Sequence, residues 1–380
     1  MRYAIIVLAL LLAGCPAGQA PSHSLSAGGS GVVPALSVSL LRTDLGLADG
    51  GLVREADSAL SELSRQGQIS YIGVGELPPE LITEGGTGDV GLPGAPVPQG
   101  TKPTGIMDSA GAQKLAAGLH DCDVVVVSSS IAARPVLARI KAGTLKAGLL
   151  VVLDDDGPAL DSGTTPVVQL HYDIRAAAFL VGVAAGTSSR SQAFVAFTST
   201  QDPHSADFLQ CLRAGLRFRM AGANLLSASL TPDADNVVAP DEFKTKRDRI
   251  FATPGLKTDH FIVDAGRATA SIMFALSTKP TNGYLLGGYG DFRQVRPARV
   301  VCCIVKHPGS SLRKLLTGAK SVKDVQAAGM SLPKLDLANG GVDVTDFSAY
   351  AHYNPDSDDI ADAVKDARGQ ILDGELDVTK

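Results

Sequence analysis

The sequence contains no tryptophan, and aromatic residues make up only 5% of its 380 residues. It also has no excess of positive charge, because 34 Lys and Arg against 39 Asp and Glu give a formal net charge of −5. The broad positive field that nucleic-acid binding usually needs is therefore missing, and we expect no nucleic-acid partner. Hydrophobic residues reach 45%, which provides enough material for a core and excludes disorder throughout the chain.

Enzyme and metal signatures are missing as well. None of the seven histidines stands at HxH or HExxH spacing. Ser128 follows a predicted strand without a Gly-x-Ser-x-Gly elbow, and Gly266 is the single glycine of an Asp-Ala-Gly turn rather than part of a dinucleotide fingerprint. We expect a protein that is not an enzyme and that carries no metal and no cofactor.

Cysteines are few, and their spacing matches no zinc pattern. Four follow Cys15 in the chain: Cys122, Cys211, Cys302 and Cys303. Three of them stand in or beside predicted strands, and Cys211 stands within a predicted helix. We favour buried small apolar residues over a structural disulfide, which is the alternative.

The N-terminus combines one positive charge with a run of about ten apolar residues, half of the roughly 20 that a membrane-spanning helix needs. Residues 1–14 therefore resemble a secretory signal peptide. The run ends Leu-Leu-Ala-Gly before Cys15, which is similar to a bacterial lipobox and implies that Cys15 is acylated. A cleaved signal with a chance cysteine is the alternative. Residues 15–34 are predicted to hold the lipid anchor and a flexible tether rich in Ala, Gly, Ser and Pro.

Beyond residue 35, apolar runs alternate with helical patterns. Strands are predicted over 35–41, 69–74, 123–127, 149–153, 193–197, 225–230, 260–263, 283–287 and 300–305. Helices are predicted over 52–66, 113–120, 131–142, 175–185, 205–220, 241–251, 267–276, 310–316 and 358–372. Strands without polar alternation, separated by helices, indicate parallel sheets covered on both faces. The number of units is too large for one sheet, so we predict an α/β fold of two lobes with the ligand cleft between them.

Residues 76–105 do not fit this pattern. They hold six prolines and seven glycines, which excludes regular structure. We interpret the segment as a solvated insertion in the first lobe, with a binding loop as the alternative.

Polar residues that follow apolar strands are the candidate ligand contacts, since ligands of such sheets bind beyond the carboxyl ends of the strands. Asp154 follows one predicted strand directly, although a solvated turn would also explain its acidic run. Lys306 ends the very apolar strand 300–305, so its charge must reach water, a partner or a ligand. Asp291 follows strand 283–287, and Gly266 opens a helix whose first amides could meet a polar ligand.

Four stretches resemble the basic membrane lipoprotein family, the purine-nucleoside-receptor-like solute-binding proteins of ABC importers. They are Tyr172 to Gly182 (YDIRAAAFLVG), Phe208 to Leu216, Leu286 to Asp291 with Pro297 to Lys306, and Val364 to Gly374. The resemblance runs from about residue 35 to the end. It implies a type 1 periplasmic binding protein fold, with two lobes joined by three crossing strands. It also implies that Asp154, Asp291 and Lys306 match positions that hold ribose and base edges in the family, that Asp49 matches the aspartate of the family motif Asp-Lys-Ser-Phe-Asn, and that Tyr289 replaces an aspartate.

The chain departs from this family where the base is held. Asp-Lys-Ser-Phe-Asn in the family corresponds here to Asp49-Gly50-Gly51-Leu52-Val53, and no second ring follows strand 225–230. Stacking on a base contributes about 1–3 kcal/mol per contact, so the loss of both rings weakens nucleoside binding by about two to four decades. We therefore expect a hydroxyl-rich or amine-bearing solute, with Tyr289 as the one ring that could restore stacking.

The combined prediction is a monomeric, lipid-anchored solute-binding protein of an ABC importer, exported to the periplasmic or outer face of the bacterial cell membrane. Its partners would be a small-molecule solute, an ABC permease and the membrane. The alternative is a surface lipoprotein with the same fold and a degenerate site, which acts through protein contacts. The expected lobe ranges are 35–166 and 167–295, with 296–330 returning to the first lobe and 331–380 to the second. The candidate ligand-binding residues are Asp49, Ser128, Asp154, Gly266, Tyr289, Asp291 and Lys306.

Overall fold

The structure is a computed structural model. It describes residues 35–42, 51–75, 109–154, 160, 162–232, 238–278, 283–293, 297–355 and 357–379. The predicted signal peptide, Cys15, the tether, Asp49 and the segment 76–105 lie outside these described residues.

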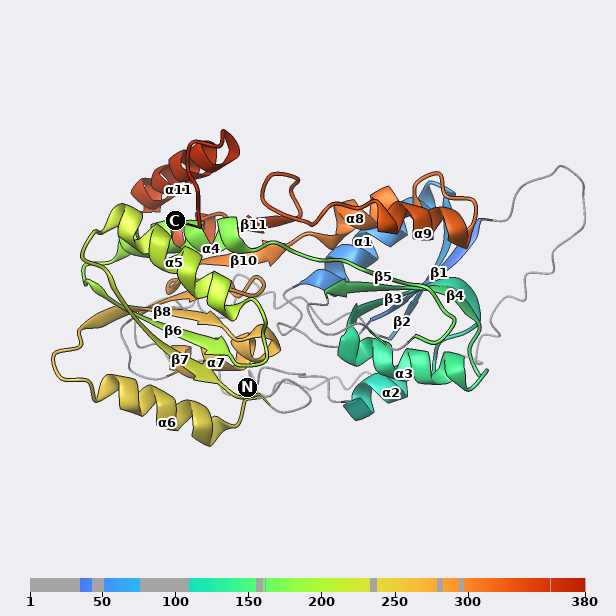
Figure 1. The fold of residues 1–380 in the computed structure, drawn as a ribbon, viewed down its shortest axis with the longest axis horizontal. Helices are drawn as coiled ribbons and strands as arrows, with labels where there is room; N and C mark the ends of the chain where they lie inside the picture. Colours follow the sequence, from blue (N-terminus) through green and yellow to red (C-terminus); the bar gives the residue numbers. More distant parts are fainter. Residues whose placement is uncertain are drawn as a thin grey trace, which may run out of the picture. The chain divides into compact units, whose positions relative to one another are not determined.

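The first lobe is built on a five-stranded parallel sheet with the order β2-β1-β3-β4-β5. Its strands are β1 (Leu36–Leu41), β2 (Ile69–Val74), β3 (Cys122–Ser129), β4 (Ala147–Asp154) and β5 (Val167–Gln169). Figure 1 shows α1, α8 and α9 over one face of this sheet and α2 and α3 over the other. These helices are α1 (Leu52–Arg65), α2 (Ser109–Ala116), α3 (Ser130–Lys141), α8 (Pro308–Leu316) and α9 (Val322–Met330).

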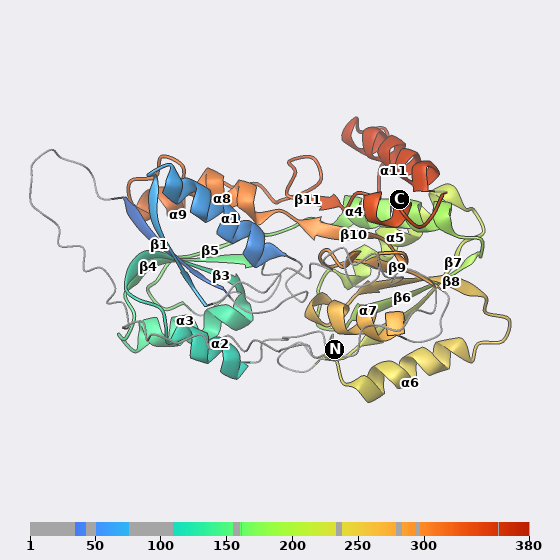
Figure 2. The same ribbon diagram turned by 180° about the vertical axis from the view of Figure 1, so that it is seen from behind.

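The second lobe is built on a six-stranded sheet with the order β11-β10-β9-β8-β6-β7, in which only β11 is antiparallel to its neighbour. Its strands are β6 (Ala193–Ser199), β7 (Asn224–Leu230), β8 (Thr258–Asp264), β9 (Tyr284–Gly287), β10 (Val300–Lys306) and β11 (Val342–Val344). Figures 1 and 2 show α4, α5 and α11 on one side of the sheet and α6 and α7 on the other. The helices are α4 (Arg175–Ser188), α5 (Ser205–Arg219), α6 (Pro240–Phe251), the short 3-10 helix η2 (Gly266–Ala268), α7 (Thr269–Thr278), α10 (Ser348–Ala351) and α11 (Ser357–Leu372).

Close backbone contact holds α4 against α5. A Cβ added at Gly215 would lie 2.0 Å from the Phe179 carbonyl oxygen, and one at Gly182 would lie 2.3 Å from the Leu212 carbonyl oxygen. Only glycine permits two helices to approach this closely, so these two positions fix the helix pair that covers the second sheet.

Three crossing segments connect the lobes: residues 170–174, the turn after Lys306, and residues 331–341. Two of them pair with each other, because the Asp173 N–H donates to Leu335 O (2.6 Å) and the Leu335 N–H donates to His171 O (2.8 Å). The third is tied to this pair by the bond from the His307 N–H to Gly341 O (2.8 Å). We refer to these three crossing segments together as the hinge, and backbone hydrogen bonds join all three.

The nine strands and nine helices predicted from hydrophobic pattern are confirmed, with ends shifted by a few residues. Four short elements were not predicted, namely β5, α9, β11 and α10, because three or four residues are too few to show a period and α9 carries a weak apolar face. Sheet pairing also corrects two boundaries. The expected ranges put β5 in the second lobe and β10 in the first, but β5 pairs in the first sheet and β10 in the second. Both strands lie beside a crossing segment, where the apolar pattern continues without marking the change of lobe.

The cysteines Cys211, Cys302 and Cys303 are buried, as predicted, and Cys122 is half-buried; all four thiols are free. Burial raises the pKa of the Cys303 thiol to about 12. Within the described ranges, no helix is both long enough and apolar enough to cross a bilayer.

Candidate functional site

Two strand ends from different lobes meet beside the hinge. Asp154 is the last residue of β4 and Lys306 is the last residue of β10, so the carboxyl end of each parallel sheet contributes one charged side chain. The Lys306 ammonium donates to Asp154 Oδ1 at 2.8 Å, and the two side chains are only 7% and 6% exposed. A charge pair this deeply buried loses hydration at both ends, so each group depends on the other.

Tyr289 completes the bonding of this carboxylate. It follows β9, in the turn that Gly290 closes with a φ of +84°, and its hydroxyl donates to Asp154 Oδ2 at 2.8 Å. Both oxygens of Asp154 are therefore bound, one by a cation and one by a phenol, and the carboxylate is fixed in orientation.

Two aromatic rings flank the ammonium. Lys306 Nζ lies 4.8 Å from the centre of the Tyr289 ring and 5.1 Å from the centre of the Tyr172 ring. A cation within about 6 Å of a ring centre gains about 0.5–2 kcal/mol, with the larger value in desolvated sites. Tyr172 lies in the first crossing segment, and its place in the quoted helix motif gave no signal of a role in the site. We refer to Asp154, Tyr172, Tyr289 and Lys306 together as the hinge cluster.

The candidates Asp291 and Ser128 are not members of the hinge cluster. Asp291 forms its own ion pair with Arg293, whose Nη2 and Nε lie 2.8 and 3.0 Å from the carboxylate oxygens. This hydrogen-bonded pair raises the pKa of Arg293, and it turns Asp291 toward a local partner instead of the hinge cluster. Ser128 is buried near the end of β3, one residue before Ser129, which is in register with Asp154.

Gly266 begins η2, is separated from β8 by Ala265, and has a φ of +54°. A Cβ added there would meet no atom within 4 Å, so the space at the start of this helix is open. No contact joins Gly266 to the hinge cluster among those found in the described part of the chain. Of the seven candidates, the structure thus brings together Asp154, Tyr289 and Lys306, while Asp49 lies outside the described residues.

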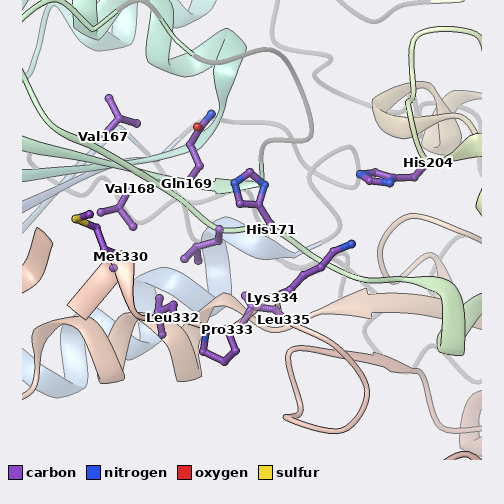
Figure 3. A pocket seen from close by; sticks show the side chains of 12 residues that line it. Val167, Val168, Gln169, His171, His204, Met330, Leu332, Pro333, Lys334 and Leu335 are labelled. Atoms are coloured by element: carbon purple, nitrogen blue, oxygen red, sulfur yellow. The ribbon is translucent and has the colours of Figure 1, made fainter. Parts of the chain in front are cut away.

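A cavity of about 590 Å³ borders the hinge, and none of the candidate residues that the structure describes lines it. Its wall consists of residues 167–171, 329–330 and 332–335 together with His204. Figure 3 shows His171 and Lys334 on the crossing segments and His204 on the chain of the second lobe. Its volume is typical of small-molecule sites, and it adjoins the hinge cluster along the chain because His171 precedes Tyr172. These three donors are 33 to 163 positions apart in sequence, so no local motif could have revealed them.

The positions where the family holds its rings carry no ring in the described residues. Leu52 is buried at the start of α1, and β7 is followed by Thr231 and Pro232, whose carbonyl accepts a bond from Gln201 (2.6 Å). Tyr289 faces the Lys306 ammonium, so its ring is already engaged. No group of three or more metal-binding side chains occurs in the part of the chain that the structure describes.

Comparisons with known proteins were made against families, curated proteins and solved structures. No family model matches the chain, and no curated protein matches it. Among solved structures, an ABC transporter system solute-binding protein from Conexibacter woesei shares 16% identity, covers 90% of this chain and 98% of its own, and superimposes with a TM-score of 0.50. A solute-binding protein of an ABC transporter system from Aeropyrum pernix shares 13% identity over 90% and 93% of the two chains, with a TM-score of 0.51.

A transcriptional activator of the comK gene from Bacillus halodurans is similar to the same extent. It shares 12% identity over 90% of this chain and 99% of its own, with a TM-score of 0.52. At these identities the likeness concerns the fold alone, and the narrower resemblance to the basic membrane lipoprotein family stays a prediction. The chain has the two-lobed α/β fold of periplasmic binding proteins, with two largely parallel sheets flanked by helices.

Proposed function

We propose that this protein is the lipid-anchored solute-binding component of an ABC importer, and that it holds a small polar solute between its lobes. The observation that carries the proposal is the cavity of about 590 Å³ at the hinge, whose wall combines His171 and Lys334 of the crossing segments with His204 of the second lobe. Two proteins of similar fold are solute-binding proteins of ABC transporter systems, which supports the same assignment.

Closure of the lobes would perform this function without covalent chemistry. A solute that contacts both lobes binds the closed form better than the open form, and it shifts the population by its difference in affinity for the two. The closed, loaded form would then be the one that an ABC permease receives. Acylation at Cys15 would keep the protein at the membrane beside that permease.

The solute class follows from what the walls offer. His171, His204 and Lys334 line the cavity at the hinge and can donate hydrogen bonds to hydroxyl, carbonyl or carboxylate oxygens. A flat base finds no Phe, Tyr or Trp ring among the described residues that line this cavity. We therefore expect a hydroxyl-rich solute to bind better than a purine nucleoside.

A thermal-shift screen against sugars, polyols, amino acids, amines and purine nucleosides tests the proposal. We expect at least one hydroxyl-rich compound to raise the melting temperature in a saturable way, and replacement of His204 by Ala to reduce that shift. Asp207→Ala is the matched control, because Asp207 is an exposed residue in the first turn of α5, the helix that follows His204, and lies outside the cavity lining. A screen in which no compound shifts the wild type would contradict a role in solute binding.

A second candidate function is that of a surface lipoprotein that acts through protein contacts. The observation that favours it is that Asp154 and Lys306 already bind each other, which leaves less unmet bonding capacity for a solute. The same screen separates the two candidates, since this one predicts no shift with any solute.

A further inference from the structure

The ammonium of Lys306 sits in surroundings that elsewhere receive cationic ligands. It contacts a carboxylate oxygen at 2.8 Å and lies within 5.1 Å of the centres of two tyrosine rings. A carboxylate combined with aromatic faces is the arrangement that recognises ammonium groups, because the ring quadrupoles and the negative charge attract the cation from several sides. Tyr289 contributes twice, through its ring and through the bond that its hydroxyl donates to the far oxygen of Asp154.

The three receiving groups come from three separate parts of the chain. Asp154 ends a strand of the first sheet, Tyr172 lies in a crossing segment, and Tyr289 follows a strand of the second sheet. Lys306 extends to them from β10, and its side chain is 93% buried. The ion pair therefore joins a strand end of the first sheet to a strand end of the second.

We propose that Asp154, Tyr172 and Tyr289 form an ammonium-binding box, and that Lys306 is its resident occupant. The side chain of Lys306 takes the place of a primary alkylammonium ligand and holds the lobes together in the absence of solute. This goes beyond the proposed function and does not depend on it, because the box can be filled whether or not a solute is ever bound.

The ammonium-binding box bears on whether an amine-bearing solute can bind. An amine-bearing solute was expected from the sequence, since Asp154 offers a carboxylate at a strand end. With the box filled by Lys306, such an amine has to displace a tethered competitor that is always present. Amine-bearing solutes are therefore selected against, and hydroxyl-rich solutes are not.

Chemical rescue tests the box directly. Lys306→Ala keeps Cβ and removes three methylene groups and the ammonium, which are the atoms that n-propylammonium supplies. At pH 7, n-propylammonium should raise the melting temperature of K306A in a saturable way, and propan-1-ol, its neutral counterpart, should not. Wild type should show no saturable rise, because its box is occupied. The double variant D154N/K306A should lose the rescue, because the carboxylate is gone.

The result that overturns the proposal is a folded K306A protein that n-propylammonium stabilises no more than propan-1-ol does. Equal stabilisation of wild type and K306A by the amine also overturns it, since the effect would then lie elsewhere. Native near-ultraviolet circular dichroism establishes that K306A is folded.

If K306A does not fold, a second variant tests the role of Lys306 in holding the lobes together. Lys306→Met keeps most of the packed stem and removes the charge, and small-angle scattering then measures the radius of gyration without solute. We expect K306M to have a larger radius than wild type, because the contact that holds the lobes is lost. The control is Lys365→Met, which replaces an exposed lysine of α11 outside the hinge. A radius for K306M equal to that of wild type and of K365M overturns the role of Lys306 in closure.

Discussion

Replacement of Asp154 by Asn tests how strongly the hinge cluster stabilises the protein. The variant keeps the size of the side chain but removes the charge that compensates the Lys306 ammonium, which is 7% exposed. Removal of one partner of a buried ion pair costs about 3–5 kcal/mol, because the remaining charge is left without compensation. The two tyrosine rings offset part of this, at about 0.5–2 kcal/mol in all. We therefore expect D154N to lower the free energy of unfolding by about 1–4.5 kcal/mol.

The double variant D154N/K306M measures the coupling energy between the two charged side chains. It removes both charges, and an apolar replacement of a buried pair is often neutral or even stabilising. We expect it to be more stable than D154N alone, with a coupling energy between the two sites of at least about 1 kcal/mol. Urea unfolding followed by circular dichroism measures the wild type, D154N, K306M and the double variant, and K365M in α11 serves as the exposed control with an effect below about 1 kcal/mol. Single variants that each change stability by less than about 0.5 kcal/mol and add without coupling would refute the account.

Three further predictions concern other parts of the chain. Gly215→Ala should lower the free energy of unfolding in urea by about 1–3 kcal/mol, because its Cβ would lie 2.0 Å from a backbone oxygen. Gly369→Ala in α11 is the control, because its Cβ would meet no atom within 4 Å and should not destabilise the protein. Burial would raise the pKa of Asp259, but bonds to His260 and other donors lower it to about 2. The ionised carboxylate therefore stabilises the folded protein by about 2 kcal/mol above pH 4, and this contribution is lost as the pH falls toward 2. Acid titration of Asp259→Asn should show no such loss. Replacement of Cys15 by Ser should move the protein from the detergent phase to the aqueous phase, and a variant that stays in the detergent phase would exclude the lipid anchor.

The fold was accessible from the sequence because hydrophobic pattern reports burial directly. The run of four valines in β3 is fully buried, and a strand buried on both faces has no polar alternation to display. What the pattern could not show is where the chain changes lobe. Strand β10 is apolar up to Lys306, and nothing in its composition distinguishes pairing in one sheet from pairing in the other.

Part of the candidate site could also be predicted from the sequence. Asp154 and Lys306 could be proposed because each ends an apolar strand, and the carboxyl ends of parallel strands share an edge. Asp291 met the same criterion, but Arg293, two residues later, binds its carboxylate. Such local competition depends on side-chain geometry that strand position does not encode. Tyr172 was not identified, because a crossing segment carries no periodic signal.

The most direct test of the central claim is calorimetric titration of the protein with the hydroxyl-rich compounds that the thermal screen selects, and with inosine in parallel. The account predicts that one such compound binds with a Kd below about 10 μM. Inosine should bind with a Kd above about 10 μM, because the protein lacks the two rings that stack on a base in the family. The contradictory result is the absence of binding by every hydroxyl-rich compound, or sub-micromolar binding of inosine that Tyr289→Ala abolishes.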